Sequence, residues 1–387
     1  MNEFTNSTYS STVTSLVGIT TIVVLLNKWT IMLIRLRRSV YGFSNRVDPL
    51  KDRFIGHKRL YSSPGVAECI PALPTAYRLT VQEAVTLWTS QFQLRGVSEP
   101  RLSSQYIIAH LLGIKTLESL GNDRQAEFLT HKQMEQTWKL CTRRLTRMPV
   151  QYVIEGWDFR DLSLKMRPPV FIPRPETEEL VGLVLADLQV LQGIGVSEQA
   201  NFQCLEVGCG SGAISLSLLY SLPQLRVIAL DKNKDAVDLT MENAHGLGLQ
   251  GQLKVHHMDV IRDADMIVKM CSPVSALVSN PPYLFSADMA FLDPEVHQFE
   301  DQAALDGGDD GMQVIRHILT LAPKLLSNTG RVYLEVDPRH PALIQQWAEG
   351  GDHGLRYVQT HCDFTGRPRF CVLENDNATH IKTMTSI

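Results

Sequence analysis

Apolar residues recur every three to four positions through the segment from residue 78 to residue 147. This period is typical of amphipathic helices, and Thr80 and Glu83 form a capping-box pattern at the start of the first one. Residues 78–147 are therefore expected to form a small helical domain. The pattern predicts one helix beginning at Thr80 and two more over 103–112 and 134–145.

The third of these helices ends in the basic residues Arg143, Arg144 and Arg147. Cations are favoured near the carboxyl end of a helix because they complement its dipole, which is one explanation for the three arginines. A patch that binds a partner is the other explanation, and the sequence leaves both open.

Beyond residue 150 the period shortens. Apolar and polar side chains alternate over 150–170, which predicts a hairpin that connects the helical domain to the rest of the chain. From there, short apolar runs alternate with helical segments, as is typical of a doubly wound sheet. The last two runs, 331–336 and 369–373, are expected to pair as an antiparallel edge. The fold class is therefore α/β, preceded by a small helical domain.

The first 77 residues have a different character. Residues 14–34 are apolar except for Asn27 and Lys28, and the stretch that follows is rich in arginine and lysine and poor in acids. A basic leader of this kind is typical of a mitochondrial transit peptide, with Met32 as a second candidate start. A membrane anchor over 14–34 is the alternative, because that stretch is long enough to span a bilayer. We interpret residues 1–77 as a transit peptide and linker, which predicts a mitochondrial matrix protein without a membrane partner.

Composition and charge exclude several functional classes. The net charge of −4 argues against a dedicated nucleic-acid-binding protein, which usually has a basic surface, so no stable nucleic-acid binding is expected. The seven cysteines include no Cys-x-x-Cys pair, and the twelve histidines show no ligand spacing. Neither a metal site nor a disulfide framework is expected.

A glycine-rich turn is the first candidate for ligand binding. It lies between a strand-like and a helix-like run, where glycines allow close approach of the backbone to a ligand and the helix start offers free N–H groups. Two later strand-like runs end in acids. Asp231 is placed to hold a ribose diol, and Asp259, followed by Val260, is placed to meet an adenine amine. The turn consists of Glu206, Val207, Gly208, Cys209, Gly210, Ser211 and Gly212.

The tetrapeptide Asn280-Pro281-Pro282-Tyr283 follows a further strand-like run and is the candidate for gripping the reacting group. Its two prolines lack N–H groups and stiffen the loop. The Asn280 side-chain oxygen and the Pro281 carbonyl oxygen can each accept one N–H of a planar amide or amine, and Tyr283 adds an aromatic face. Structural alternatives are core packing for Tyr283 and a turn-forming role for Asn280.

These features, each at a strand end and in this order, resemble the S-adenosylmethionine-dependent methyltransferases. Three further segments narrow the resemblance: Met-Pro-Val-Gln-Tyr at 148–152, Pro-Arg-Pro-Glu-Thr-Glu at 173–178, and Ala-Leu-Asp-Gly-Gly-Asp-Asp-Gly at 304–311. With them, residues 78–375 resemble the HemK/PrmC-type peptide chain release factor glutamine methyltransferases, most closely the mitochondrial members.

The resemblance implies S-adenosylmethionine as the methyl donor and, as substrate, the glutamine of the Gly-Gly-Gln motif in class I peptide chain release factors. It implies a helical substrate-binding domain at 78–147, a hairpin connector at 148–170 and a Rossmann-like methyltransferase domain at 171–378. The catalytic residues would be Asn280, Pro281 and Tyr283, which would bind the substrate together with Pro282, Arg174 and Glu176. Cofactor contacts would fall on Glu206, Gly208, Cys209, Gly210, Ser211, Gly212, Asp231, Asp259, Val260 and Asn280. Some relatives carry an aromatic residue in place of Val260.

Catalysis by such a site is expected to depend on positioning and electrostatics, because a carboxamide nitrogen is a weak nucleophile and a sulfonium donor needs no activation. The alternative enzyme is an adenine methyltransferase acting on DNA or RNA, since the same loop fits the exocyclic amine of a flipped base. A non-catalytic module that senses S-adenosylmethionine is a further alternative. The compact helical domain, the negative net charge and the complete Asn-Pro-Pro-Tyr loop favour the release-factor enzyme.

Overall fold

The computed structural model describes residues 71–74, 77–193, 202–351 and 353–376. The chain divides into two compact units, Met1–Glu68 and Cys69–Ile387, and the described residues all belong to the second. The transit peptide, the candidate start at Met32 and the alternative anchor over 14–34 therefore lie outside the described residues. Within the described ranges, no helix has the length and apolar character needed to cross a membrane.

The helical segment begins at the predicted capping box. The Thr80 amide donates to the Glu83 carboxylate at 2.8 Å, and the Glu83 amide donates to Thr80 Oγ1 at 3.2 Å, at the start of α2 (Val81–Leu94). The third predicted helix, α5 (His131–Leu145), starts earlier than expected because Thr130 and Gln133 form a second capping box. The remaining elements of this segment are α3 (Pro100–Leu111), η1 (Leu117–Ser119) and α4 (Asn122–Gln125).

Aromatic side chains form the core between these helices. Trp88 of α2 is fully buried, and its ring meets that of Trp138 of α5 edge to face with centroids 5.1 Å apart. Phe92 lies one turn further along α2, with its centroid 5.8 Å from that of Trp88. Burial of large aromatic groups contributes more than any other side-chain burial to a core of this size, so the three rings stabilise the packing of α2 against α5.

The connection to the sheet differs in part from the prediction. Val150–Val153 forms a short helix, α6, where an alternating strand pattern had been expected. Val150 and Val153 lie one helical turn apart and both pack on the helical core, whereas Tyr152 is buried in a separate cluster and donates its hydroxyl to the Val170 carbonyl at 2.6 Å. The hairpin itself is present further along as β1 (Gly156–Phe159) and β2 (Leu162–Lys165).

A seven-stranded sheet with the order β5-β4-β3-β6-β7-β9-β8 forms the larger part of the described chain. β3 to β7 are parallel to one another, whereas β9 is antiparallel to both β7 and β8. The predicted antiparallel pairing at the end of the chain is confirmed. The strands of the seven-stranded sheet are β3 (Gln203–Val207), β4 (Arg226–Asp231), β5 (Leu253–His257), β6 (Val274–Ser279), β7 (Leu326–Glu335), β8 (Leu355–Cys362) and β9 (Pro368–Asn375).

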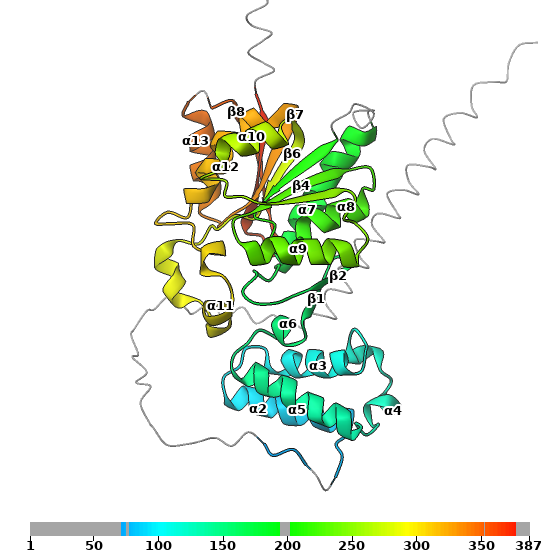
Figure 1. Ribbon diagram of the computed structural model, residues 1–387. Coiled ribbons are helices and arrows are strands. Elements are labelled where there is room, and N and C mark those ends of the chain that lie inside the picture. The colour runs from blue at the N-terminus through cyan, green and yellow to red at the C-terminus, as the bar shows by residue number, and fades with distance from the viewer. Residues whose placement is uncertain (1–70, 75–76, 194–201, 352, 377–387) are drawn as a thin grey trace, which may run out of the picture. The chain divides into compact units, whose positions relative to one another are not determined.

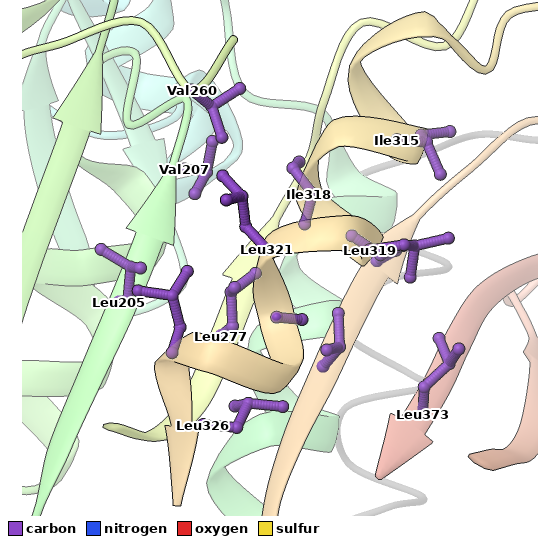
Figure 2. Close-up of a cluster of buried hydrophobic side chains, with 14 of the residues drawn as sticks. Leu205, Val207, Val260, Leu277, Ile315, Ile318, Leu319, Leu321, Leu326 and Leu373 are labelled. Carbon is purple, nitrogen blue, oxygen red and sulfur yellow. The ribbon is translucent and has the colours of Figure 1, made fainter. Parts of the chain in front are cut away.

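Helices cover both faces of this sheet (Figure 1). Side chains of α7 (Pro175–Gly193), α8 (Ala213–Ser221) and α9 (Lys234–Gly246) share a core with one face. Side chains of α10 (Ala264–Cys271), α12 (Gln313–Leu325) and α13 (His340–Glu349) share a core with the other. Figure 2 shows α12 lying across the second face, with Ile318 and Leu321 directed at Leu277 and Val207 of the strands. The α/β prediction with a preceding helical segment is therefore confirmed.

The order of the central strands places a crevice at one edge of the sheet. The chain runs outward from β3 to β4 and β5, and then returns to the other side of β3 as β6. Loops that leave the carboxyl ends of β3 and β6 consequently diverge, and ligands of open parallel sheets bind at such a switch point. The glycine-rich turn follows β3 and the Asn-Pro-Pro-Tyr loop follows β6.

Candidate functional site

The glycine-rich turn between β3 and α8 adopts a conformation that only glycine tolerates well. Gly208, Gly210 and Gly212 have φ angles of +80°, +55° and +84°. A Cβ placed on Gly210 would meet no atom within 4 Å, so the turn faces open space at this point. The Gly210 amide donates to Asp231 Oδ2 at 2.9 Å, which connects the turn to the end of β4.

Asp231 lies beneath this turn with both carboxylate oxygens engaged. Its other oxygen, Oδ1, accepts from the Asn233 amide at 2.8 Å. Burial raises the pKa of Asp231, and the two amide hydrogen bonds oppose that shift. Each carboxylate oxygen has a second lone pair, so the carboxylate, fixed in place, can still accept hydrogen bonds from a ligand hydroxyl.

A cavity at the carboxyl ends of β3, β4, β5 and β6 brings most of the predicted cofactor residues together. Val260 is buried in the core beneath the cavity, where Figure 2 shows it beside Val207. An open glycine turn, a fixed carboxylate on β4 and apolar walls form a donor and acceptor set that fits an adenosyl group. The predicted residues that line this cavity are Gly208, Gly210, Asp231, Asp259, Val260, Asn280, Pro281 and Pro282.

Among the residues of this cavity that the sequence did not single out are Phe171 and Asp301. Phe171 lines it and also lines the two neighbouring cavities, and its ring carries the Arg174 guanidinium at 4.8 Å. Asp301 lines it and accepts from Asn233 Nδ2 at 2.7 Å, next to Asp231. The signal for Phe171 was its place just before the Pro-Arg-Pro-Glu-Thr-Glu segment, whereas nothing in the local sequence distinguishes Asp301 from other loop acids.

A smaller cavity lies directly against the glycine-rich turn. Its walls include Glu206, Cys209 and Ser211, together with Asn280. Glu206 is 1% exposed and accepts from the Ser215 amide at 2.9 Å at the start of α8, and burial raises the pKa of its carboxyl to about 8. These contacts tie Glu206 to the frame of the turn. A direct contact with the cofactor stays a prediction for Glu206 and for the other candidate cofactor residues, of which Gly212 lines none of the three cavities of this site.

The Asn280 side chain is held from behind by two other elements. Its Nδ2 donates to Thr177 Oγ1 at 3.2 Å in the first turn of α7, and the Thr177 hydroxyl donates to Glu335 Oε2 at 2.8 Å at the end of β7. The other oxygen of Glu335 accepts from Tyr283 Oη at 3.3 Å. One buried carboxylate therefore supports both ends of the Asn-Pro-Pro-Tyr loop.

A third cavity lies on the far side of this loop. Asn280, Pro281 and Tyr283 line it together with Arg174, which donates to the buried Glu300 at 2.7 Å. Glu176 lines none of the three cavities, although burial raises the pKa of the Tyr283 hydroxyl and the Glu176 carboxylate is near enough to add to that rise. Apolar walls that the sequence did not predict come from Leu284, Leu292, Val296 and Leu305.

The segment at 304–311 forms the back of the same loop. The Leu284 amide donates to the Leu305 carbonyl at 2.9 Å, and the Gly307 amide donates to the Leu284 carbonyl at 2.8 Å. A Cβ on Gly307 would lie 2.7 Å from the Pro282 carbonyl oxygen and 2.6 Å from that of Gly311, closer than side chains approach. Glycine is therefore required here because two backbone segments touch.

The arginines at the end of α5 have a role that neither sequence explanation included. Arg144 is buried and its guanidinium nitrogens lie 3.2 Å from Glu295 Oε1 in α11 (Pro294–Phe299). Arg147 Nη2 lies 2.6 Å from the other oxygen of Glu295. The two arginines therefore fix the position of α11, which lies in the chain between η3 (Ser286–Phe291) and η4 (Gln302–Ala304). Val296 of α11 lines the third cavity.

Among the residues that the structure describes, no group of three or more histidine, cysteine or carboxylate side chains could hold a metal ion.

Comparisons with known proteins agree with this geometry. The model of the PrmC N-terminal domain matches residues 83–154, and that of the methyltransferase small domain matches residues 190–341. The chain is 50% identical over 301 residues to the human protein named MTRF1L release factor glutamine methyltransferase, covering 78% of this chain and 89% of the relative. It is 30% identical over 300 residues to the release factor glutamine methyltransferase of Deinococcus radiodurans, covering 76% of this chain and 97% of the relative. These matches confirm the resemblance that the motifs suggested, and the chain belongs to the HemK/PrmC family of release factor glutamine methyltransferases, which are S-adenosylmethionine-dependent protein-glutamine N-methyltransferases.

Proposed function

We propose that this protein methylates the side-chain amide nitrogen of the glutamine in the Gly-Gly-Gln motif of mitochondrial class I peptide chain release factors. The observation that carries the proposal is the position of Asn280 and Pro281, which line both the cavity with the adenosyl-type donor set and the cavity beyond it. Because these two residues line both cavities, a planar amide held in the third cavity can present its nitrogen to the first. The human relative, half identical to this chain, is named for the glutamine of a release factor.

In this proposal the Asn-Pro-Pro-Tyr loop holds the reacting amide by its two N–H groups. Asn280 Oδ1 and the Pro281 carbonyl oxygen each accept one N–H, which turns the nitrogen toward the cofactor cavity and favours electron density on it. Tyr283 covers the amide plane from its place on the wall of the third cavity. The amide nitrogen gains a methyl group and releases one proton to water.

S-adenosylmethionine, when bound, supplies a methyl group on a positively charged sulfur that leaves as a neutral thioether. In this proposal, the backbone at Gly208 and Gly210 approaches the nucleoside part closely, and Asp231 accepts hydrogen bonds from its ribose diol. Asp259 and Val260 hold the adenine, and Glu206, Cys209, Ser211 and Gly212 maintain the turn around it. Arg174 and Glu176 contact the approaching release factor, and Arg174 does so from the wall of the third cavity.

The parts of the chain are assigned to this task as follows. Residues 78–147 bind the release factor, 148–170 connect, and 171–378 carry the cofactor and the chemistry. The basic leader within 1–77 directs the protein to the mitochondrial matrix and is removed there. The negative net charge supports a protein substrate over a nucleic acid.

The proposal is tested by incubating the purified enzyme with labelled S-adenosylmethionine and a mitochondrial class I release factor, and locating the label by mass spectrometry. Label on the glutamine of Gly-Gly-Gln is the expected result. A release factor with glutamate at that position should receive none, because a carboxylate lacks the two N–H donors that the loop requires. Equal labelling of the glutamate variant, or of adenine in an oligonucleotide, would refute the assignment.

A further inference from the structure

The support behind Asn280 suggests how the orientation of its amide group is fixed. The two ends of an asparagine amide have opposite hydrogen-bonding character, and only the network around them determines which end faces a ligand. If the reaction follows the proposed function, on which this inference rests, the oxygen must face the substrate. Two residues that the sequence did not single out, Thr177 and Glu335, decide that orientation.

The network has a single consistent direction. Glu335 is 1% exposed, and its carboxylate has no proton to donate when ionised. The Thr177 hydroxyl must therefore donate its one proton in a hydrogen bond to Glu335 Oε2, 2.8 Å away. Thr177 Oγ1 is then available only as an acceptor, and it receives a proton from Asn280 Nδ2 at 3.2 Å. The nitrogen end of the Asn280 amide is committed to the protein, which leaves the oxygen end for the substrate.

We propose that Glu335 and Thr177 are positioning residues that orient Asn280 to accept an N–H, and so set the enzyme's preference for a substrate amide. Glu335 acts at both ends of the loop, because its second oxygen accepts from Tyr283 Oη at 3.3 Å. Thr177 is 3% exposed and belongs to α7, and Glu335 is the last residue of β7. The loop is therefore anchored to a helix and to a strand of the sheet. Neither residue needs to touch the substrate.

Protonation of Glu335 would reverse this direction. A carboxylic acid can donate to Thr177 Oγ1, which frees the hydroxyl proton for Asn280 Oδ1 and allows the amide to turn over. Burial raises the pKa of Glu335 to about 7, with the nearby Glu176 carboxylate adding to the rise and Thr177, Tyr283 and Arg369 opposing it. Methyl transfer should therefore increase as the pH rises through the neutral range.

The first test compares Thr177→Val with Thr177→Ser. Valine keeps the shape but removes the hydroxyl, whereas serine keeps the hydroxyl. Thr177→Val should lower kcat by about 10- to 100-fold, which is typical for misplacement of a group that binds the reacting atoms. The KM for the release factor and the Kd for S-adenosylmethionine should change less than threefold, and Thr177→Ser should retain most of kcat. An equal loss of kcat in both variants, or a loss confined to cofactor binding, would refute the proposed role of Thr177.

The second test uses Glu335→Gln, which keeps the size of the side chain but cannot ionise. The wild-type increase in kcat across the neutral pH range should disappear in this variant, because a glutamine side chain does not titrate there. An unchanged pH profile would refute the role of Glu335 even if the Thr177 variants fail to fold. Asn280→Ala separates this inference from the proposed function. Full activity of Asn280→Ala would refute the proposed grip of Asn280 on the substrate amide. An inactive Asn280→Ala together with a fully active Thr177→Val would refute only the role of Thr177 in orienting Asn280.

Discussion

The buried ion pair between Arg144 and Glu295 allows a quantitative prediction for the variant Glu295→Gln. Glu295 receives hydrogen bonds from Arg144 at 3.2 Å, Arg147 at 2.6 Å and Ser98 Oγ at 2.8 Å. Its side chain is 8% exposed and that of Arg144 is 3% exposed, so water cannot replace these contacts. Glutamine keeps the shape of the side chain and one acceptor oxygen but leaves the Arg144 charge buried without a counterion.

The size of the effect follows from the ionisation of Glu295. Burial by itself would raise the pKa of this carboxyl, but hydrogen bonds from Arg147 and Ser98 outweigh burial and lower it from 4.5 to about 2. Such a shift corresponds to about 3 kcal/mol of stability at neutral pH. The cost of breaking one side of a buried ion pair, about 3–5 kcal/mol, is similar. Because the pKa is lowered on folding, this stabilisation is present above about pH 4.5 and is lost as the pH falls toward 2.

Thermal or urea unfolding of wild type and Glu295→Gln at pH 7 should therefore show a loss of about 3 kcal/mol, and the difference should shrink below pH 4.5. The exposed Glu118 provides a matched control, and Glu118→Gln should lie within about 0.5 kcal/mol of wild type. The KM for the release factor should also rise in Glu295→Gln, since Val296 on the same helix lines the third cavity. A difference below about 1 kcal/mol at pH 7 would refute the view that this pair fixes α11.

Three further predictions concern the cofactor, the loop and the leader. Asp231→Ala should weaken S-adenosylmethionine binding on the order of tenfold or more in calorimetry, because a ribose diol loses its acceptor at a cost of about 1–3 kcal/mol; an unchanged Kd would contradict the assignment. Gly307→Ala should abolish most methyl transfer because its Cβ would lie 2.7 Å from the Pro282 carbonyl oxygen, whereas Gly121→Ala, whose Cβ meets nothing within 4 Å, should be fully active. A fusion of residues 32–75 to a fluorescent protein should enter the mitochondrial matrix, with the mature enzyme beginning near Ser62; cytosolic fluorescence would contradict the targeting prediction.

Several parts of the molecule could be predicted because their causes are local in the chain. The capping box joins Thr80 to Glu83 three residues away, and the prolines of the 280–283 loop restrict their own backbone. The glycine-rich turn and Asp231 could be recognised as candidate ligand-binding residues because each directly follows an apolar run. Since parallel strands end at one edge of a sheet, these segments could be assigned to one site from order alone.

The same reasoning fails where a segment's environment is supplied by distant residues. Val150–Val153 alternates like a strand but becomes helical, because the helical core and a second cluster accept its side chains at helical spacing. The apolar pattern did not predict strand β8, because it lies at the edge of the sheet, where one of its eight side chains is buried and the alternation is weak.

The sequence by itself determined the fold class, the family and the loop that would grip an amide. Only the tertiary structure decided how that loop is oriented. Thr177 and Glu335 are 158 residues apart, and Asn280 lies 103 residues from Thr177. Their contact depends on the strand order that places β7 beside β6 and on the packing of α7 against one face of the sheet. A local pattern reports periods and turns, whereas the direction of a hydrogen bond between distant side chains arises only when the sheet has assembled.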